Sequence, residues 1–458
     1  MQTSAAPSGL EPLIPPCPEP APDDLSPRQL TAIVRTNGLR QWPQRAYEEE
    51  YVRRGFFGRA THLVNAPEAI RHVLIDRHEN YARTRATLRV LRPLLGDGLF
   101  ISQGEAWRHQ RRTLAPAFTP RSVELLVPHI RSAAQETIDA LAGQAGGPVD
   151  LLGAIQRLAL EIAGRTMFSL EMRAHGPTLR DYVTRYARLA PPQLLDFLLP
   201  IGIPTPHDIA RAMFRRRWIR FVDEILAARL QAKRDHGLPR DLLDSLIAAR
   251  DPETGQGFSP AQLRDQVATM ILAGHETTAL ALFWSLYLLA LSPAAQERVA
   301  GEADTVGSGA GGSQLSGLTY TRAVVDEAMR LYPPAYVIVR TVRQAERFAG
   351  VDVNARDLVI ISPWVLHRHR RRWHEPDVFN PERFLPGAPA VDRFSYLPFG
   401  AGPRVCIGAH FALTEATLVL SELVRTFRIE VAGTRPVLPV AIVTTQPDQA
   451  PLFRLHRR

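Results

Sequence analysis

The alternation of apolar and polar positions predicts a mainly helical chain with short strands towards both ends. Residues 59–65 alternate as a strand does, and residues 66–76 continue with helical spacing. Residues 346–366 fit a pair of strands around a polar turn, and residues 427–456 alternate again. Residues 120–250 repeat the helical period. We therefore expect a mainly α fold with small β-sheets.

Proline-rich breaks interrupt this helical region at residues 191–192 and 201–206. Such breaks suit a mobile lid over a ligand pocket. They are equally typical of an ordinary connection between helices, so both interpretations stay open. Further along, residues 306–317 are rich in glycine and serine, which favours a surface loop.

The longest apolar stretch, residues 267–291, contains a single acid, Glu276, near its middle. Ser259 and Pro260 provide an N-cap and a first-turn proline, and Ser292 precedes another proline. A helix of this kind, ~48 Å long, either crosses a membrane or forms the centre of a large core. Because the chain has no second such stretch, we interpret it as a core helix and expect no membrane anchor.

The composition is that of a globular protein, with 45% hydrophobic and 22% charged residues among 458. The net charge of +9 would suit a nucleic-acid binder, but apart from Lys233 the basic residues are arginines. GC-rich codons explain this bias, and the densest basic run, residues 367–372, is short and lies between apolar segments. We therefore expect no nucleic-acid partner.

The two cysteines, Cys17 and Cys406, cannot build a disulfide framework, which indicates a reducing cytoplasm. Residues 1–43 contain nine prolines and no charged segment followed by an apolar one. We therefore expect no signal peptide, and a leader that is extended or poorly ordered.

Residues 399–408 read Phe-Gly-Ala-Gly-Pro-Arg-Val-Cys-Ile-Gly and lead into an apolar helical stretch, residues 409–424. The glycines allow a tight turn and close approach to a bulky, flat group. A helix N-terminus stabilises the thiolate of Cys406, and such a thiolate suits axial ligation of haem iron. A phosphate loop is excluded because Gly400 and Gly402 are followed by Pro, Arg and Cys. A buried structural cysteine and a cysteine nucleophile remain alternatives.

Residues 273–278, within the central helix, read Ala-Gly-His-Glu-Thr-Thr. Glycine and threonine are poor helix formers, and threonine hydroxyls can bond to the carbonyl four residues earlier and bend the helix. We expect a distorted turn with freed backbone groups and room for water. The alternative is an ordinary helix with harmless polar residues.

Two further patterns involve charge. Glu327 and Arg330 share a helix face, an arrangement that is often only a weak surface ion pair. Downstream, residues 379–384 read Phe-Asn-Pro-Glu-Arg-Phe and supply Arg383. Three further segments each contain an arginine that could pair with a buried carboxylate. Any one of these arginines, taken alone, is more often a solvated side chain. They are Arg111, four residues after Trp107, then Arg340, and Arg404 two residues before the cysteine.

These motifs resemble those of the cytochrome P-450 family. The family's haem loop, Phe-x-x-Gly-x-Arg-x-Cys-x-Gly, is matched at each fixed position. The oxygen-groove motif is matched by residues 273–278, and the two charged motifs follow in the family's order, over residues 60–450 in all. The fixed positions of the loop are Phe399, Gly402, Arg404, Cys406 and Gly408.

The resemblance implies a single domain, residues 44–458, with haem b between the oxygen-groove helix and the cysteine-bearing helix. It implies that Cys406 is the iron ligand, that Thr277 orders dioxygen and its protons, and that Glu276 leads to the proton supply. It also implies a buried structural triad of Glu327, Arg330 and Arg383 beneath the loop. The implied haem contacts are Trp107, Arg111, Arg340, Phe399 and Arg404.

By the same resemblance we expect a cytoplasmic monooxygenase that inserts one oxygen atom of O2 into an apolar small molecule. About 50 residues follow Cys406, so electrons are expected from a separate ferredoxin or flavodoxin with its reductase. We expect Arg108 and Arg112 to form a basic docking face for that partner. The alternatives are a haem-thiolate peroxygenase or isomerase, and a haem sensor without turnover. Substrate contacts are expected from residues 88–101, 270–277, 334–339 and 443–445.

Overall fold

The computed structural model describes most of the 458-residue chain. The residues outside the description are 1–11, 24, 57–58, 145, 170–174, 188, 190–195, 197–198, 200–201, 232–240, 308–311 and 442. The predicted break at residues 191–192 lies outside the described residues. So do parts of the predicted break at 201–206 and of the loop at 306–317.

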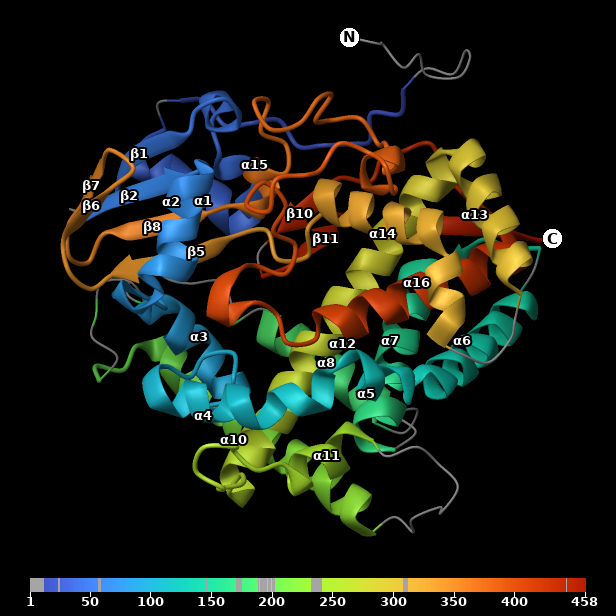
Figure 1. The fold of residues 1–458 in the computed structure, drawn as a ribbon, viewed down its shortest axis with the longest axis horizontal. Helices are drawn as coiled ribbons and strands as arrows, with labels where there is room; N and C mark the ends of the chain where they lie inside the picture. Colours follow the sequence, from blue (N-terminus) through green and yellow to red (C-terminus); the bar gives the residue numbers. More distant parts are fainter. Residues whose placement is uncertain are drawn as a thin grey trace.

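Helices make up most of the described chain, as the apolar spacing predicts, and they gather on one side of the molecule (Figure 1). The five-stranded sheet and the β6-β7 hairpin lie on the other side, whereas the sheet that contains β9 and β12 packs against helices α6 and α12. The helices are α1 (Pro27–Thr36), α2 (Pro67–Arg71), α3 (Arg85–Leu95), α4 (Gly104–Leu114), α5 (Pro120–Glu124), α6 (Val127–Ala142), α7 (Leu151–Phe168), α8 (Gly176–Ala187), α10 (Pro206–Gln231), α11 (Leu242–Ala248), α12 (Pro260–Leu291), α13 (Pro293–Val306), α14 (Thr319–Leu331), α15 (Pro363–Leu366) and α16 (Ala409–Thr426).

The strands form a mixed sheet of order β1-β2-β8-β5-β3, a sheet of order β4-β12-β9, and the hairpins β6-β7 and β10-β11. The strands predicted near both ends of the chain are therefore confirmed. Their bounds are β1 (Tyr51–Phe56), β2 (Arg59–Val64), β3 (Tyr81–Ala82), β4 (Val149–Asp150), β5 (Ile338–Val342), β6 (Glu346–Phe348), β7 (Val351–Val353), β8 (Leu358–Ile361), β9 (Phe427–Val431), β10 (Pro439–Ala441), β11 (Thr445–Pro447) and β12 (Leu452–Arg457).

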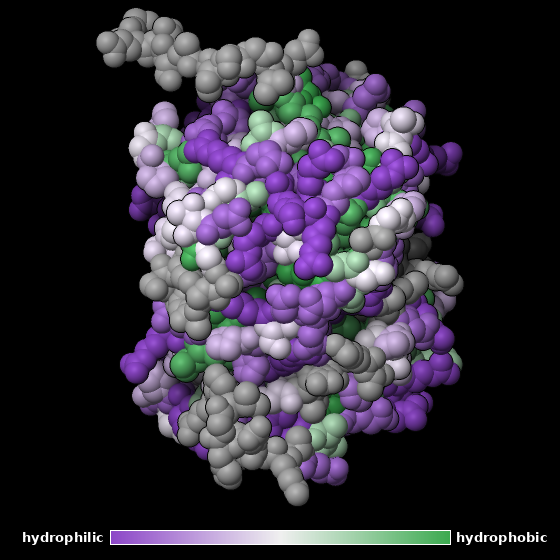
Figure 2. Space-filling view, turned by 90° about the vertical axis from the view of Figure 1, so that its right-hand side faces the viewer, coloured by the Kyte–Doolittle hydropathy of each residue, from purple (hydrophilic) through white to green (hydrophobic). Residues whose placement is uncertain are grey.

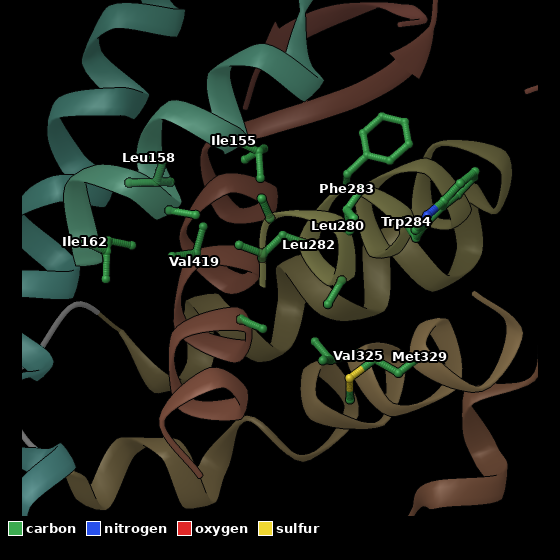
Figure 3. Packing of buried hydrophobic residues seen from close by; sticks show 14 of the residues in the cluster. Ile155, Leu158, Ile162, Leu280, Leu282, Phe283, Trp284, Val325, Met329 and Val419 are labelled. Atoms are coloured by element: carbon green, nitrogen blue, oxygen red, sulfur yellow. The ribbon is translucent and has the colours of Figure 1, made fainter. Parts of the chain in front are cut away.

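Helix α12 is the centre of the core. It starts with a capping box between Ser259 and Gln262 and runs unbroken for 32 residues. Within the described chain it is the one helix long and apolar enough to span a membrane, but 72% of its most apolar window is buried inside the protein. Leu280, Leu282 and Phe283 pack there beside side chains of α7, α14 and α16 (Figure 3). On the face drawn in Figure 2, hydrophilic side chains cover most of the surface.

The described part of the leader differs from the expected extended chain. Ser26 and Gln29 form a capping box that starts α1, because each side chain satisfies a backbone N–H of the other. Asn37 then donates to Pro439 O (3.0 Å) and accepts from Ala441 N (3.1 Å). The prolines are therefore compatible with a leader that forms a helix and hydrogen-bonds to the β10 strand.

Candidate haem site

The cysteine loop is tightly folded in front of α16. The Cys406 N–H donates to Phe399 O (2.9 Å), and Val405 N donates to Gly402 O (3.0 Å). Gly402 has a φ of +73°, and a Cβ atom there would collide with the carbonyl oxygen of Leu74. Glycine is required at this point because it alone fits both the backbone angle and the close approach.

Two opposing effects act on the Cys406 thiol. Burial raises its pKa, while the backbone N–H of Gly408 and the nearby charge of Arg111 lower it. Arg111, on α4, also donates to Val405 O (3.0 Å). Burial is the largest of these effects and leaves the pKa of the thiol raised, whereas the N–H of Gly408 and the charge of Arg111 are the groups that stabilise a thiolate for a metal.

Three half-buried arginines from distant parts of the chain lie close together: Arg83, Arg340 and Arg404. Burial lowers the pKa of Arg340 to about 10, and burial with the charge of Arg340 lowers the pKa of Arg404 to about 10. The pKa of Arg83 is lowered by burial and by the charges of the other two. Among the described residues, none of the three has an ion pair with a carboxylate.

This arginine cluster fits the two propionates of a haem. The Nε of Arg83 is buried without a hydrogen-bond partner, and Arg404 donates to Ser102 O (2.8 Å) while lying 4.2 Å from the ring of Trp107. Buried like charges are unfavourable unless an anion neutralises them. Cys406 would provide the thiolate for the iron. The residues present therefore suit both the iron and the propionates of a haem.

The structure assigns different places to the predicted haem contacts. Arg340, Arg404 and Trp107 lie in or beside the arginine cluster, whereas Arg111 bonds to the cysteine loop. Phe399 is partly buried and packs against the core. Arg83 was not predicted, because it belongs to no motif. An arginine in the run Tyr-Ala-Arg-Thr-Arg is expected to be an exposed side chain.

The oxygen-groove motif is continuous helix rather than the distorted turn that we expected. The hydroxyl of Thr277 donates to Ala273 O (2.8 Å), and Thr278 donates to Gly274 O (3.0 Å). These are the bonds four residues back that threonine favours in helices. In α12 the two hydroxyls give Ala273 O and Gly274 O an additional hydrogen bond, and the helix stays unbroken. The expected space for water therefore does not arise from a broken turn.

Unlike the two threonines, Glu276 bonds to residues outside its own helix. Its Oε1 accepts hydrogen bonds from Thr444 Oγ1 (3.0 Å) and from Gln446 Nε2 (2.6 Å), both in the β10–β11 hairpin. The segment 443–445, expected to contact substrate, therefore lies against α12. Thr445 N donates to Pro334 O (3.1 Å), which brings the expected segment 334–339 to the same place.

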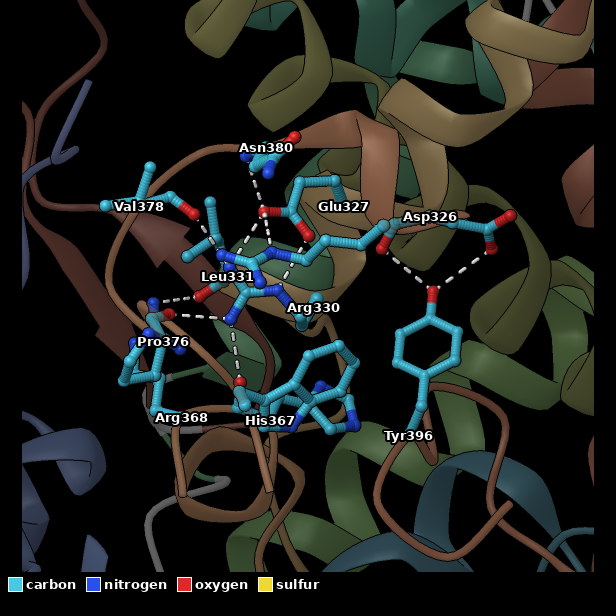
Figure 4. A network of polar contacts seen from close by, with 12 residues as sticks. Asp326, Glu327, Arg330, Leu331, His367, Arg368, Pro376, Val378, Asn380 and Tyr396 are labelled. Atoms are coloured by element: carbon cyan, nitrogen blue, oxygen red, sulfur yellow. Dashed lines mark hydrogen bonds and ion pairs between the residues drawn. The ribbon is translucent and has the colours of Figure 1, made fainter. Parts of the chain in front are cut away.

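Glu327 and Arg330 lie together, as Figure 4 shows, and Arg383 comes near Glu327, which is the grouping that the resemblance implies. Glu327 and Arg330 are fully buried and paired through two bonds of 2.6 and 2.8 Å. Arg383 lies farther away, with its Nε 3.6 Å from Glu327 Oε1. Arg330 also donates to the carbonyls of His367, Pro376 and Val378, so it fastens the downstream segment to α14.

His367 links this network to the cysteine loop, a role that the sequence did not suggest. Its backbone oxygen accepts from Arg330 (2.8 Å), and its Nε2 accepts from the N–H of Leu397 (2.8 Å). Burial, with the charges of Arg330 and Arg368, lowers the pKa of His367 to about 3, so the ring is a neutral acceptor. In the sequence it was one residue of a short basic run.

The expected docking face at Arg108 and Arg112 is not free. Arg112 pairs with the buried carboxylate of Asp251 through bonds of 3.0 and 2.9 Å and also reaches Glu253 (3.0 Å). Arg108 forms ion pairs with Glu79 and Glu105. These charges are paired locally, so the two side chains form no free basic surface, and docking of a redox partner at this face stays a prediction.

A cysteine loop at a helix start, with half-buried arginines in and beside it and a polar motif in the central helix, is typical of a haem-thiolate protein. The chain belongs to the cytochrome P-450 family, whose sequence profile matches residues 40–450. It is accordingly a haem-binding oxidoreductase of the monooxygenase kind.

Relatives and a solved structure agree with this assignment. Cyclooctatin synthase of Streptomyces melanosporofaciens is 34% identical over 82% of this chain and 82% of that protein. Cyclooctat-9-en-7-ol 5-monooxygenase of the same organism is 32% identical over 89% and 86%, and pentalenene oxygenase of Streptomyces avermitilis 31% over 80% and 81%. The crystal structure of the cytochrome P450DA heme domain superposes with a TM-score of 0.76, at 25% identity, over 89% of this chain and 90% of that one.

Proposed function

We propose that the protein uses haem b to insert one oxygen atom of O2 into an apolar small molecule, with electrons from a separate ferredoxin or flavodoxin and its reductase. The observation that carries the proposal is the Glu276–Thr277 pair in α12, a helix that contacts α16, which begins three residues after Cys406. An acid and a hydroxyl at this place are needed to supply protons when O2 is reduced. A peroxygenase, an isomerase or a sensor does not need them.

Each residue has a proposed part in this chemistry. Bound through a thiolate, haem supplies the oxidising chemistry and favours O–O cleavage. Cys406 holds the iron, and Arg83, Arg340 and Arg404 hold the propionates, with Trp107 fixing Arg404 by its ring. Phe399 accepts the Cys406 N–H through its carbonyl and shapes the loop.

Proton supply is proposed for the middle of α12. The hydroxyl of Thr277 orients a proton donor towards the O2 that is being reduced. The carboxyl of Glu276 resupplies that donor with protons from solvent. Glu327, Arg330 and Arg383 fasten the segment that carries the cysteine loop. They touch neither substrate nor haem in this proposal.

The substrate class is supported by the relatives. Their names describe an unsaturated hydrocarbon, pentalenene, and an unsaturated alcohol, cyclooctat-9-en-7-ol. We propose an apolar substrate with few polar groups, contacted by the segments 88–101, 270–277, 334–339 and 443–445. The two unpaired cysteines support a reducing, cytoplasmic location.

The test is reconstitution with a ferredoxin or flavodoxin, its reductase, NAD(P)H and a panel of apolar compounds chosen by their shift of the haem spectrum. Product that requires O2, NAD(P)H and the reductase, and that incorporates one labelled atom from 18O2, is the expected result. Product with hydrogen peroxide alone would favour a peroxygenase. Compounds that shift the spectrum without any product would favour a sensor.

A further inference from the structure

The carboxylate of Glu276 is held by two side chains that lie 168 and 170 residues away in the sequence. Its Oε1 accepts from Thr444 Oγ1 at 3.0 Å and from Gln446 Nε2 at 2.6 Å. Gln446 Nε2 also lies 3.3 Å from Thr444 Oγ1, which closes a ring of three polar groups. Neither hairpin residue belongs to a motif that pointed to the haem site.

The geometry of the hairpin explains why both donors reach the same acid. Successive side chains of a strand point to opposite faces, so Thr445 and Gln446 of β11 face opposite ways, and Thr444, in the bend just before the strand, reaches the same acid as Gln446. Thr445 is anchored by its hydroxyl to Pro333 O (2.6 Å) and by its carbonyl to the indole N–H of Trp284 (3.0 Å). Anchoring the middle residue fixes the direction of its two neighbours.

The neighbours of Glu276 on α12 bond differently. The side chains of His275, Thr277 and Thr278 each donate to a carbonyl of their own helix, four residues back. Their directions are therefore set locally. The hydrogen bonds of Glu276 in the described structure go instead to the hairpin, so the hairpin sets where this carboxylate points.

We infer that Thr444 and Gln446 are positioning residues for proton supply, which hold the Glu276 carboxylate in one direction against the β10–β11 hairpin. This role rests on the proposed function. Val443, which is 51% exposed, precedes Thr444 in a segment proposed to contact substrate. A substrate that presses on this turn therefore acts on the acid as well, and proton supply becomes sensitive to an occupied pocket.

The first experiment measures coupling, the product formed per NAD(P)H consumed. Gln446→Leu and Thr444→Val should lower coupling several-fold and raise hydrogen peroxide, with little change in substrate affinity. Thr444→Ser keeps the hydroxyl and should stay close to wild type. Gln449→Leu is the matched control, because Gln449 follows β11 by two residues and donates to Pro436 O (3.4 Å) instead of to Glu276.

A double-mutant cycle tests whether these residues act through the acid. In a Glu276→Gln background, Gln446→Leu should cause no further loss of coupling. A full additional loss, or Gln446→Leu with wild-type coupling, would overturn the inference. If the wild-type protein shows no O2-dependent product at all, the proposed function fails and this role fails with it.

A readout independent of turnover comes from hydrogen exchange on the haem-loaded protein. A bond that orders Glu276 must by linkage stabilise the hairpin, so Glu276→Ala should speed amide exchange over residues 443–447. Asp304→Ala, an exposed acid on α13, is the control and should leave that segment unchanged. Unchanged exchange in Glu276→Ala would show that the contact orders neither partner, whatever the activity.

Discussion

Cys406 combines a tight loop with a helix start, and this determines its chemistry. The N–H of Gly408 and the charge of Arg111 lower the pKa that burial raises. We predict that Cys406→Ser abolishes the red-shifted Soret band of the CO-bound ferrous protein, because a hydroxyl is a poor iron ligand. Cys17→Ser is the control and should keep the band. A normal band in Cys406→Ser would remove this residue from the iron.

Thr277 has a hydroxyl whose hydrogen bond goes to Ala273 O in its own helix. We predict that Thr277→Ala leaves haem content, substrate binding and reduction unchanged, because other residues provide these. Product should fall while NAD(P)H consumption continues and hydrogen peroxide rises, because proton delivery to the oxygen is misdirected.

The measurement is product and peroxide per NAD(P)H in the same reaction, with Thr277→Ser as the control that keeps the hydroxyl. Thr278→Ala provides a second comparison, since Thr278 bonds to Gly274 O in the same way. Wild-type coupling in Thr277→Ala would reduce this residue to a packing role.

Helix α14 is fastened to the segment before the cysteine loop by one arginine. The fully buried Arg330 makes two bonds to Glu327 and three to backbone carbonyls. We predict that Arg330→Ala lowers the free energy of unfolding by about 3–5 kcal/mol, because a buried carboxylate loses its partner. Arg383→Ala should cost less, since Arg383 is 3.6 Å from Glu327 and partly exposed.

The check is chemical denaturation of both variants together with their haem content. Arg298→Ala is a surface control, because its ion pair with Glu382 is about half exposed on both sides. Equal stability of Arg330→Ala and wild type would contradict the prediction, and so would a larger loss in Arg383→Ala than in Arg330→Ala.

Elements with local signals were predictable, and contacts between distant elements were not. The start of α12 follows from Ser259 and Pro260, and β2 follows from alternation over residues 59–65. The partner of Arg112 is 139 residues away and that of Glu276 is 168 residues away, so no local pattern contains them. The expected distortion at residues 273–278 failed because threonine can bond to its own helix without breaking it.

The charge distribution bears on the redox partner. The net charge of +9 favours an acidic partner at long range, but Arg112 is held by Asp251 and Glu253. We predict that the rate of reduction falls with ionic strength, while Arg112→Gln changes that salt dependence little. Stopped-flow reduction at several salt concentrations is the measurement. A clearly weaker salt dependence of the reduction rate in Arg112→Gln would show that Arg112 is part of the docking surface.

The arginine cluster joins three regions that are far apart in the chain: the segment after β3, strand β5 and the cysteine loop. Arg83, Arg340 and Arg404 repel one another until an anion neutralises them. Bound haem should therefore stabilise the protein as a whole. A ligand at 1,000 times its Kd adds about 4.1 kcal/mol to the free energy of unfolding.

We predict that haem dimethyl ester, which lacks the propionate charges, stabilises the reconstituted protein less than haem does. Arg83→Gln should narrow that difference, because one of the three cations is gone. Arg53→Gln, an exposed arginine on β1, should leave it unchanged. Thermal unfolding and haem transfer to an acceptor protein measure the effect. If the ester and haem stabilise equally, the arginines do not bind the propionates, and their burial without carboxylates needs another anion.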